Sequence, residues 1–412
     1  MRYPLDLLAN GSIVRLSFFA LSVLGIAAGI VACSSQTDQP GEVHEDARPP
    51  NGDEASPSFD ASPSQDAASP DTALGEAQTT VEAQVPVEAH APGEAQARGD
   101  SENHVFDSVD KNHLLKLLQD LTGGNPITVN GATFRITNRW APGAKADFRS
   151  YWKQYFVDLG ATVNELTFPV AQSLVGESQG HNVEAILPGR SADSVVIIVH
   201  YDSVGITGQE TANPAADDDG SGLAMQMEAA RIFAQSKDRA YTLRFVAADY
   251  EEITTLQGDD AYAQYLQGEA QQKGFKILVA SDNDQTAWSC WDEALCGPGA
   301  PAANTSFQMI SCSGDIHAYS YPDLAMGFVD VATKYSPTMK VDTSCDGAGD
   351  TDHYSFWKIG VPAYVIDEYS ANKNPHFDDT GDDTMQHINL DYFLHISQIQ
   401  ITFQSRLAGI KF

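Results

Sequence analysis

Two strongly apolar stretches of this 412-residue chain end in residues that can bind metal ions. The run VVIIV leads directly into His200 and Asp202, and the run RFVAA is followed closely by Glu251 and Glu252. Three consecutive aspartates, residues 217–219, lie between the two runs. Imidazole and carboxylate groups are ligands for zinc and similar divalent ions, and a carboxylate can also act as a general base. These residue types are therefore suited to binding divalent metal and to moving a proton.

The three groups must be brought together by the fold. Apolar runs bounded by polar residues predict strands at 161–170, 181–187, 194–200, 241–248, 275–281 and 361–366. Helical patterns predict helices at 105–121, 145–159, 221–235, 259–266, 352–359 and 391–407. We therefore predict an α/β fold with a mixed, mostly parallel central sheet, helices on both faces and a hairpin at one edge. Polar residues that follow parallel strands meet at one edge of such a sheet, where ligands bind.

The N-terminal residues 1–33 read as a targeting segment. An apolar run of 17 residues follows Arg15 and ends at Ala32, just before Cys33. This pattern resembles the bacterial lipoprotein signal, in which the cysteine becomes a lipidated N-terminus, and a transmembrane anchor or a plain cleaved signal is the alternative. Each interpretation places the rest of the chain outside the cytoplasm, and the first predicts a lipid anchor in a bacterial membrane.

Residues 34–102 have the composition of a disordered tether. They are acidic and rich in alanine, proline and serine, with a short imperfect repeat of the type Glu-Ala-Gln. Such a segment cannot bury enough apolar surface to fold. The folded domain should therefore comprise residues 103–412. The net charge of −32 also excludes the basic surface that nucleic-acid binding requires.

Residues 285–350 interrupt the alternation of strands and helices and look loop-like. They contain four cysteines, Cys290, Cys296, Cys312 and Cys345, which allow three disulfide pairings. Their spacing favours Cys290 with Cys296 and Cys312 with Cys345. A thiolate zinc site is the alternative, but the spacing matches no zinc finger or ribbon. Trp288 and Trp291 could line a substrate pocket or pack in the core.

Several short motifs, in one order, carry a resemblance to a known family. They are HYDS at 200–203, AADDDGSG at 215–222, YEE at 250–252, TDH at 351–353 and NPH at 374–376. Over roughly residues 130–405 the chain resembles the zinc-dependent aminopeptidases related to bacterial leucyl aminopeptidase, which are M28-type exopeptidases with two zinc ions. The resemblance implies peptide substrates and hydrolysis by a water molecule that the two ions activate.

The resemblance also implies which residues hold the two zinc ions. Asp218 would bridge them, His200 and Asp282 would complete the shell of one ion, and Glu252 and His376 would complete the other. Asp284 lies close to Asp282 in the sequence and could take its place. His353 and His387 are alternative candidates for the place of His376.

The same resemblance gives roles to residues beside the ions. Glu251 would be the general base that passes a proton from the water to the leaving amine. The Asp202 carboxylate would hold the second imidazole nitrogen of His200, while Asp352 and His353 would orient the site. The acidic loop 378–383 reads as a solvated loop rather than a calcium site.

The sequence thus predicts a monomeric metallo-aminopeptidase that removes N-terminal residues from peptides. Three alternatives remain: a carboxypeptidase-type enzyme, a glutaminyl-cyclase-like zinc enzyme on the same fold, and a surface binding module without catalysis. A serine hydrolase is disfavoured because Ser221 lies in Asp-Gly-Ser-Gly and not in a Gly-x-Ser-x-Gly elbow.

Overall fold

The computed structural model describes residues 92–171, 173, 175–204, 213–252, 256–289, 305–313, 319–345, 351–368, 374–376 and 382–412. The targeting segment with Cys33 and most of the predicted tether lie outside this part of the chain, so both stay predictions. Among the residues described, no helix combines the length and the apolar character needed to cross a membrane.

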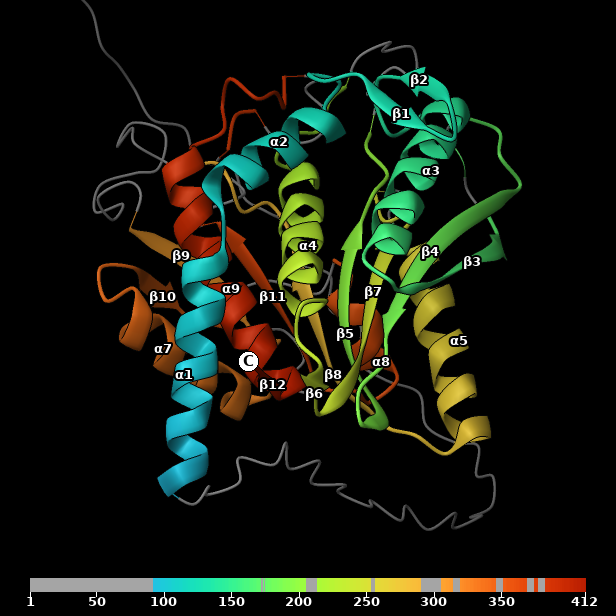
Figure 1. The fold of residues 1–412 in the computed structure, drawn as a ribbon. Coiled ribbons are helices and arrows are strands. Elements are labelled where there is room, and N and C mark those ends of the chain that lie inside the picture. Colours follow the sequence, from blue (N-terminus) through green and yellow to red (C-terminus); the bar gives the residue numbers. More distant parts are fainter. Residues whose placement is uncertain are drawn as a thin grey trace, which may run out of the picture. The chain divides into compact units, whose positions relative to one another are not determined.

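A mixed sheet of eight strands forms the centre of the described structure (Figure 1). Its strands are β3 (Thr162–Pro169), β4 (Gln179–Leu187), β5 (Ser191–His200), β7 (Tyr241–Ala248), β8 (Ile277–Asn283), β9 (Ser306–Ile310), β10 (Lys340–Asp342) and β11 (Ala363–Glu368). They lie in the order β10-β9-β11-β8-β5-β7-β4-β3. Strand β5 is parallel to both of its neighbours, whereas β3 and β4 form the antiparallel hairpin predicted for the edge. The predicted fold class is confirmed.

Helices cover both faces of the sheet. They are α1 (Pro92–Ser108), α2 (Lys111–Leu121), α3 (Pro142–Asp158), α4 (Gly220–Phe233), α5 (Gln257–Lys273), α7 (Pro322–Tyr335), α8 (His353–Lys358) and α9 (Leu390–Ala408). Along β5, Val195, Ile197 and Val199 belong to the core shared with α2, α3, α4, α7 and α9. Val196 and Ile198 face the opposite core with α5 and α8. This alternation is the period of two expected of a strand buried on both faces.

The beginning of the folded domain differs from the prediction. Residues 105–121 form two helices, because the side chain of Asp110 accepts a hydrogen bond from the backbone N–H of Asn112 and starts α2 separately. Helix α1 begins at Pro92, so residues 92–102 belong to a helix and not to the tether. Glu102 is buried there against Arg406, 2.7 Å from its Nε. Burial alone would raise the pKa of Glu102, but Arg406 and Lys334 lower it to about 2.

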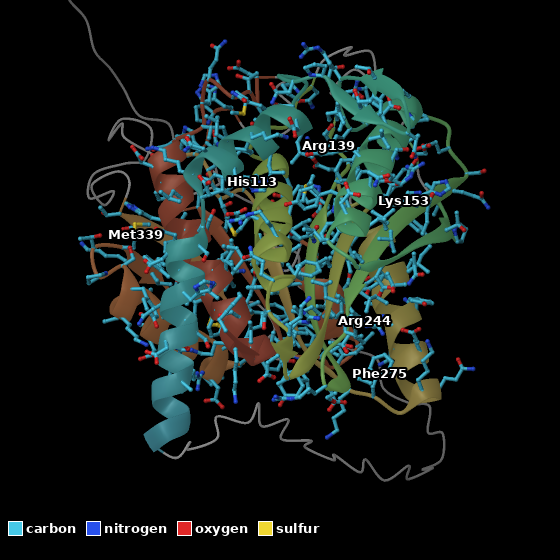
Figure 2. All side chains as sticks on the ribbon, in the orientation of Figure 1. His113, Arg139, Lys153, Arg244, Phe275 and Met339 are labelled. Carbon is cyan, nitrogen blue, oxygen red and sulfur yellow. A yellow bond between two sulfur atoms is a disulfide. The ribbon has the colours of Figure 1, made fainter. Side chains whose placement is uncertain are left out.

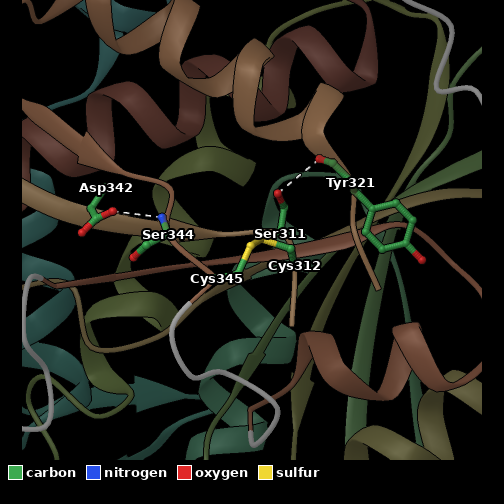
Figure 3. The surroundings of a disulfide bond; sticks show 6 residues. All are labelled: Ser311, Cys312, Tyr321, Asp342, Ser344 and Cys345. Atoms are coloured by element: carbon green, nitrogen blue, oxygen red, sulfur yellow. Dashed lines mark hydrogen bonds between the residues drawn. A yellow bond between two sulfur atoms is a disulfide. The ribbon is translucent and has the colours of Figure 1, made fainter. Parts of the chain in front are cut away.

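The region 285–350 is more regular than predicted, because it contains β9, α7 and β10. A disulfide joins Cys312, just after β9, to Cys345, just after β10, with Cα atoms 5.3 Å apart (Figure 3). The predicted pairing of these two cysteines is confirmed. Cys290, Cys296 and Trp291 lie outside the described residues.

Two small antiparallel pairs complete the fold. Strands β1 (Ile127–Val129) and β2 (Ala132–Phe134) form a hairpin, and β6 (Asp238–Arg239) pairs with β12 (Ile410–Lys411). The hairpin turns at Asn130 and Gly131, both at positive φ, which is the backbone that this residue pair favours. Neither pair contributes residues to the site described next.

Candidate active site

His200 is the last residue of β5 and the centre of the candidate site. Because β5 runs parallel to β7 and β8, the segments that follow all three strands emerge at the same edge of the sheet. The imidazole Nε2 of His200 lies 3.1 Å from Oδ1 of Asp218 and 3.7 Å from Oδ1 of Asp284. His200 and the loop of three aspartates, which were predicted to meet, therefore lie in direct contact, and Asp284 lies beside them.

Two sets of possible metal ligands share His200. One combines His200 with Asp218 and Glu252, and the other combines it with Asp219 and Asp284. Within each set the ligand atoms lie within 4.8 Å of one another. These are nitrogen and carboxylate oxygen donors, which suit zinc and other first-row divalent ions.

The three consecutive aspartates have three different partners. Asp219 caps helix α4, since its Oδ1 accepts a hydrogen bond of 2.7 Å from the N–H of Gly222. Asp217 points to another loop and accepts a hydrogen bond of 2.8 Å from the N–H of Ala287. The middle residue, Asp218, places its Oδ1 3.1 Å from His200 Nε2. It belongs to the ligand set with Glu252, whereas Asp219 belongs to the set with Asp284.

The loop that carries these aspartates is held by two residues that sequence reasoning missed. Asp383 accepts hydrogen bonds of 2.9 Å from the backbone N–H groups of both Asp217 and Asp218. Arg139, which is fully buried, donates to the carbonyl oxygens of Tyr201 and Ala215 at 2.8 Å each (Figure 2). The expectation that residues 378–383 form only a solvated loop is thus wrong for Asp383, because its carboxylate is buried against the loop.

Asp282 occupies a different place from the one predicted. It lies within β8, and its Oδ2 is 3.1 Å from the backbone nitrogen and 3.2 Å from Nδ1 of His353. The structure does not group it with His200. Asp284, just beyond the strand end, takes that position instead. His353 thus positions a buried carboxylate and packs edge-on against Trp357.

Asp202 contacts His200 through its backbone rather than its side chain. The carbonyl oxygen of Asp202 lies 3.1 Å from Nδ1 of His200. The carboxylate instead accepts a hydrogen bond of 3.1 Å from the backbone N–H of Glu251. Instead of the predicted contact between carboxylate and imidazole, Asp202 makes two hydrogen-bond contacts, which position the candidate ligand His200 and the candidate base Glu251.

His376 is grouped with different partners from those predicted. Its Nδ1 lies 2.9 Å from Oδ2 of Asp382, and Nε2 of His387 lies 3.4 Å from Oδ1 of the same carboxylate. The two imidazole rings stack with centroids 3.4 Å apart. Among the described residues, these three form a separate set of possible ligands, without Glu252.

Asp352, which was predicted to orient the site, forms a pair of buried carboxyl groups with Asp259, which was not predicted. Asp259 lies in the first turn of α5 and Asp352 just before α8, and both are fully buried. Burial raises the pKa of Asp259 to about 6. Burial and the neighbouring Asp259 raise the pKa of Asp352 well above its ordinary value. The pair therefore retains a proton at pH values at which exposed aspartates are already ionised.

The site as a whole has an excess of negative charge. Burial alone would lower the pKa of His200, but the carboxylates of Glu251, Asp218 and Asp284 raise it well above its ordinary value. Burial and nearby carboxylates likewise raise the pKa of Glu251 well above its usual range. A centre that holds protons so strongly is also a centre that attracts metal cations.

Trp288 is buried beside this centre and packs in the core. Its backbone N–H donates to Oε2 of Glu368 at 2.9 Å. Asn374, two residues before His376, donates to Oε1 of the same carboxylate at 3.1 Å. These contacts connect the segment around His376 to the end of β11.

The comparison with known families gives a match over more than half of the chain. The sequence profile described as Peptidase family M28 matches residues 182–404. This range includes His200, Asp218, Glu251, Glu252 and His376.

Individual relatives are more distant. The chain is 29% identical over 247 residues to leucine aminopeptidase 1 of Metarhizium robertsii, covering 59% of this chain and 58% of that protein. It is 27% identical over 235 residues to leucine aminopeptidase 1 of Trichophyton equinum, covering 55% and 58%. The chain thus spans less than two thirds of the length of these relatives.

Solved structures share the fold at lower sequence identity. The LapA aminopeptidase of Legionella pneumophila superposes with a TM-score of 0.54 at 21% identity, covering 75% of each chain. A glutaminyl cyclase of Fimbriiglobus ruber superposes with a TM-score of 0.55 at 18% identity, covering 72% of this chain and 94% of the other.

Proposed function

Because the chain belongs to Peptidase family M28, we propose that it is a zinc-dependent aminopeptidase that removes N-terminal residues from peptides. One observation carries the proposal: His200 at the end of the central strand is shared by two sets of donors, each with two buried members and one half-buried member. The named likeness to fungal leucine aminopeptidases supports the polarity of cleavage.

The donor chemistry fits bound zinc. Within the described residues, Oδ2 of Asp219 and Oδ1 of Asp284 are buried without a hydrogen-bond donor. Buried charged oxygens of this kind are costly unless a cation compensates them. We assign His200 and Asp284 to one ion and Glu252 and His376 to the other, with Asp218 common to both. Asp284 replaces Asp282 in this assignment.

Two bound zinc ions would lower the pKa of a water molecule and polarise the scissile carbonyl group. The chain itself would supply the proton transfer. Glu251 is fixed through its backbone by Asp202 and is not a member of either ligand set. Its raised pKa suits a carboxylate that accepts a proton and then returns it to the leaving amine. Bound ions would lower that pKa again.

The charge of the site also favours a free amino terminus. The loop of three aspartates, Glu251 and Asp284 together create a negative potential at the edge of the sheet, which attracts an ammonium group. The two bound ions would offset much of this charge, so the likeness to named aminopeptidases remains the stronger support for aminopeptidase over carboxypeptidase activity.

We further propose that the enzyme acts outside the cytoplasm as a monomer, anchored to a bacterial membrane through lipidated Cys33. The Cys312–Cys345 disulfide supports an oxidising compartment. Radiolabelled palmitate incorporation into the full chain, compared with Cys33→Ser, would test the anchor. Equal labelling of the two proteins would contradict it.

The activity is tested with one peptide in three forms: free, N-acetylated and C-amidated. The full chain is supplied with zinc, and products are identified by mass spectrometry. Loss of cleavage on N-acetylation alone would support an aminopeptidase, whereas loss on C-amidation alone would contradict it. A peptide with N-terminal glutamine completes the panel, because release of ammonia without shortening would indicate a cyclase instead.

A further inference from the structure

We propose that His376, Asp382 and His387 form a third divalent-metal site, and that an ion bound there withdraws His376 from the two catalytic ions. The inference rests on the proposed function, since that function assigns His376 to the catalytic pair. It predicts an enzyme that loses activity when zinc is in excess.

The donor atoms of the three side chains already have the spacing of a metal site, although the two imidazole rings, stacked with their planes 9° apart, must turn so that both lone pairs point at one ion. The nearest donor atoms are 2.9 Å and 3.4 Å apart, and all lie within 4.8 Å of one another. Four ligands at bond lengths of about 2.1 Å around zinc are separated by roughly 3.4 Å. Two imidazoles and one carboxylate leave the fourth position to water, as in three-ligand zinc sites.

The site is open to solvent, unlike the centre at His200. The side chain of Asp382 is 59% exposed, and those of His376 and His387 are 23% and 24% exposed. An ion can therefore reach these donors directly from solution. It would also bind more weakly than an ion at buried donors, because exposed donors must give up water to bind it.

The backbone that carries these donors is nevertheless held in place by the described structure. The backbone N–H of His376 donates to Oδ1 of Asn374 at 2.9 Å, and that of His387 donates to the carbonyl oxygen of Thr384 at 3.0 Å. Asp382 precedes Asp383, which is bonded to the backbone of the aspartate loop at the catalytic centre. The proposed third site is thus attached to the edge of the active site.

Competition follows from the chemistry of imidazole. A neutral imidazole has one nitrogen lone pair available to a metal, because the other nitrogen carries the proton. In the structure Nδ1 of His376 faces the carboxylate of Asp382, on the side of His387. An ion bound by Nδ1 therefore excludes one at Nε2 unless the ring loses its second proton. His376 can serve one site or the other.

A simpler role for Asp382 is to orient His376 toward the catalytic ions through Nδ1. A variant of His387 distinguishes this orienting role from a third metal site. Orientation of His376 needs only Asp382, whereas the third metal site needs His387 as a ligand. The decisive variant is therefore His387→Asn, because His387 has no part in the proposed catalytic machinery.

The experiment uses the full chain, His387→Asn and the control His395→Asn, which alters a histidine of α9 outside all three ligand sets. Zinc bound per chain is measured by equilibrium dialysis, and leucyl anilide hydrolysis is measured over the same zinc concentrations. We expect a third, weaker ion in the parent and the control, with activity falling as it binds. His387→Asn should weaken the third ion at least about tenfold and keep full activity in excess zinc.

Three results would overturn the proposal. They are no third ion in the parent protein, a third ion unaffected by His387→Asn, or a third ion that leaves activity unchanged. If no substrate is hydrolysed at any zinc concentration, the proposed function fails, but dialysis still tests the site. Dialysis should then still detect the third, weaker ion in the parent and a weakened or absent third ion in His387→Asn.

Discussion

The donors around His200 and those around His387 are built in different ways. His200 and Asp218 end a central strand and precede a helix, and their side chains are 1% and 5% exposed. His376, Asp382 and His387 lie on short segments beside α9, and their side chains are 23% to 59% exposed. One region is fixed by the sheet and kept from water, whereas the other stays in contact with solvent.

Because of this difference, the proposed enzyme should hold its two ions with unequal affinity. Donors that are buried and pre-positioned lose little freedom when an ion binds, so binding there should be tight. The ion that depends on His376 is completed by a residue from the exposed region. It should exchange more readily, and four predictions test this contrast.

The largest effect is expected at Glu251, which lies on the buried side but binds neither ion in our assignment. Glu251→Gln keeps the backbone hydrogen bond to Asp202 and removes the proton acceptor. We expect kcat to fall by about 10²–10⁴-fold with unchanged zinc content, measured by steady-state kinetics and elemental analysis. Activity within tenfold of the parent would remove Glu251 as the base.

The two histidine ligands provide the most direct comparison of the regions. His200→Asn should mainly weaken the ion that we assign to His200 and Asp284. His376→Asn should mainly weaken the other ion, which we assign to Glu252 and His376. We expect each loss to be at least about 100-fold in affinity, since even residues that only support a ligand are worth 10–100-fold. Zinc titration against a chromophoric chelator measures the affinity of each ion in both variants. If each variant weakened the two ions equally, the contrast between the buried and the exposed region would be contradicted.

The neighbouring aspartates Asp282 and Asp284 make a matched pair. Asp284→Asn should reduce zinc affinity by about 10–100-fold because its carboxylate lies beside His200. Asp282→Asn should keep two zinc ions and lower the free energy of unfolding by about 1–3 kcal/mol, because it weakens the contacts with His353. Zinc titration and urea unfolding distinguish the two. The reverse pattern would return the ligand role to Asp282.

Much of the buried region could be predicted from sequence because its signals are local. A short apolar run fixes β5, and the residues that follow it must emerge at the sheet edge. The uncertainty between Asp282 and Asp284 arose because strand ends shift by one or two residues. A shift of two keeps the same face, so alternation of side chains cannot decide between them.

The features that were missed depend on long-range contacts or on signals that were overlooked. Arg139 and Asp383 support the aspartate loop from distant parts of the chain, and no local pattern marks them. Helix α7 was detectable, since Leu324, Phe328 and Val331 follow helical spacing, but the surrounding cysteines and tryptophans suggested a loop. The hairpin of β1 and β2 had the Asn-Gly turn signal.

The last prediction concerns the pH dependence of stability at the buried pair Asp259 and Asp352, on the side of the sheet away from the exposed histidines. Folding raises the pKa of Asp259 from 3.8 to about 6, so the folded state binds the proton more tightly than the unfolded state. Stability of the metal-free protein should therefore fall as pH rises through this window and stay reduced above it. A rise of this size corresponds to about 3 kcal/mol.

Asp259→Asn keeps a polar group opposite Asp352 and removes the titrating carboxyl group. Between pH 4 and pH 7, the melting temperature of the metal-free parent should fall relative to that of the variant, with the variant more stable at pH 7. Scanning calorimetry with a chelator present measures both profiles. Parallel profiles would mean that Asp259 is ionised in the folded protein, and that the buried side of the site tolerates more negative charge than its burial implies. The case for a cation as the partner of that charge would then be weaker.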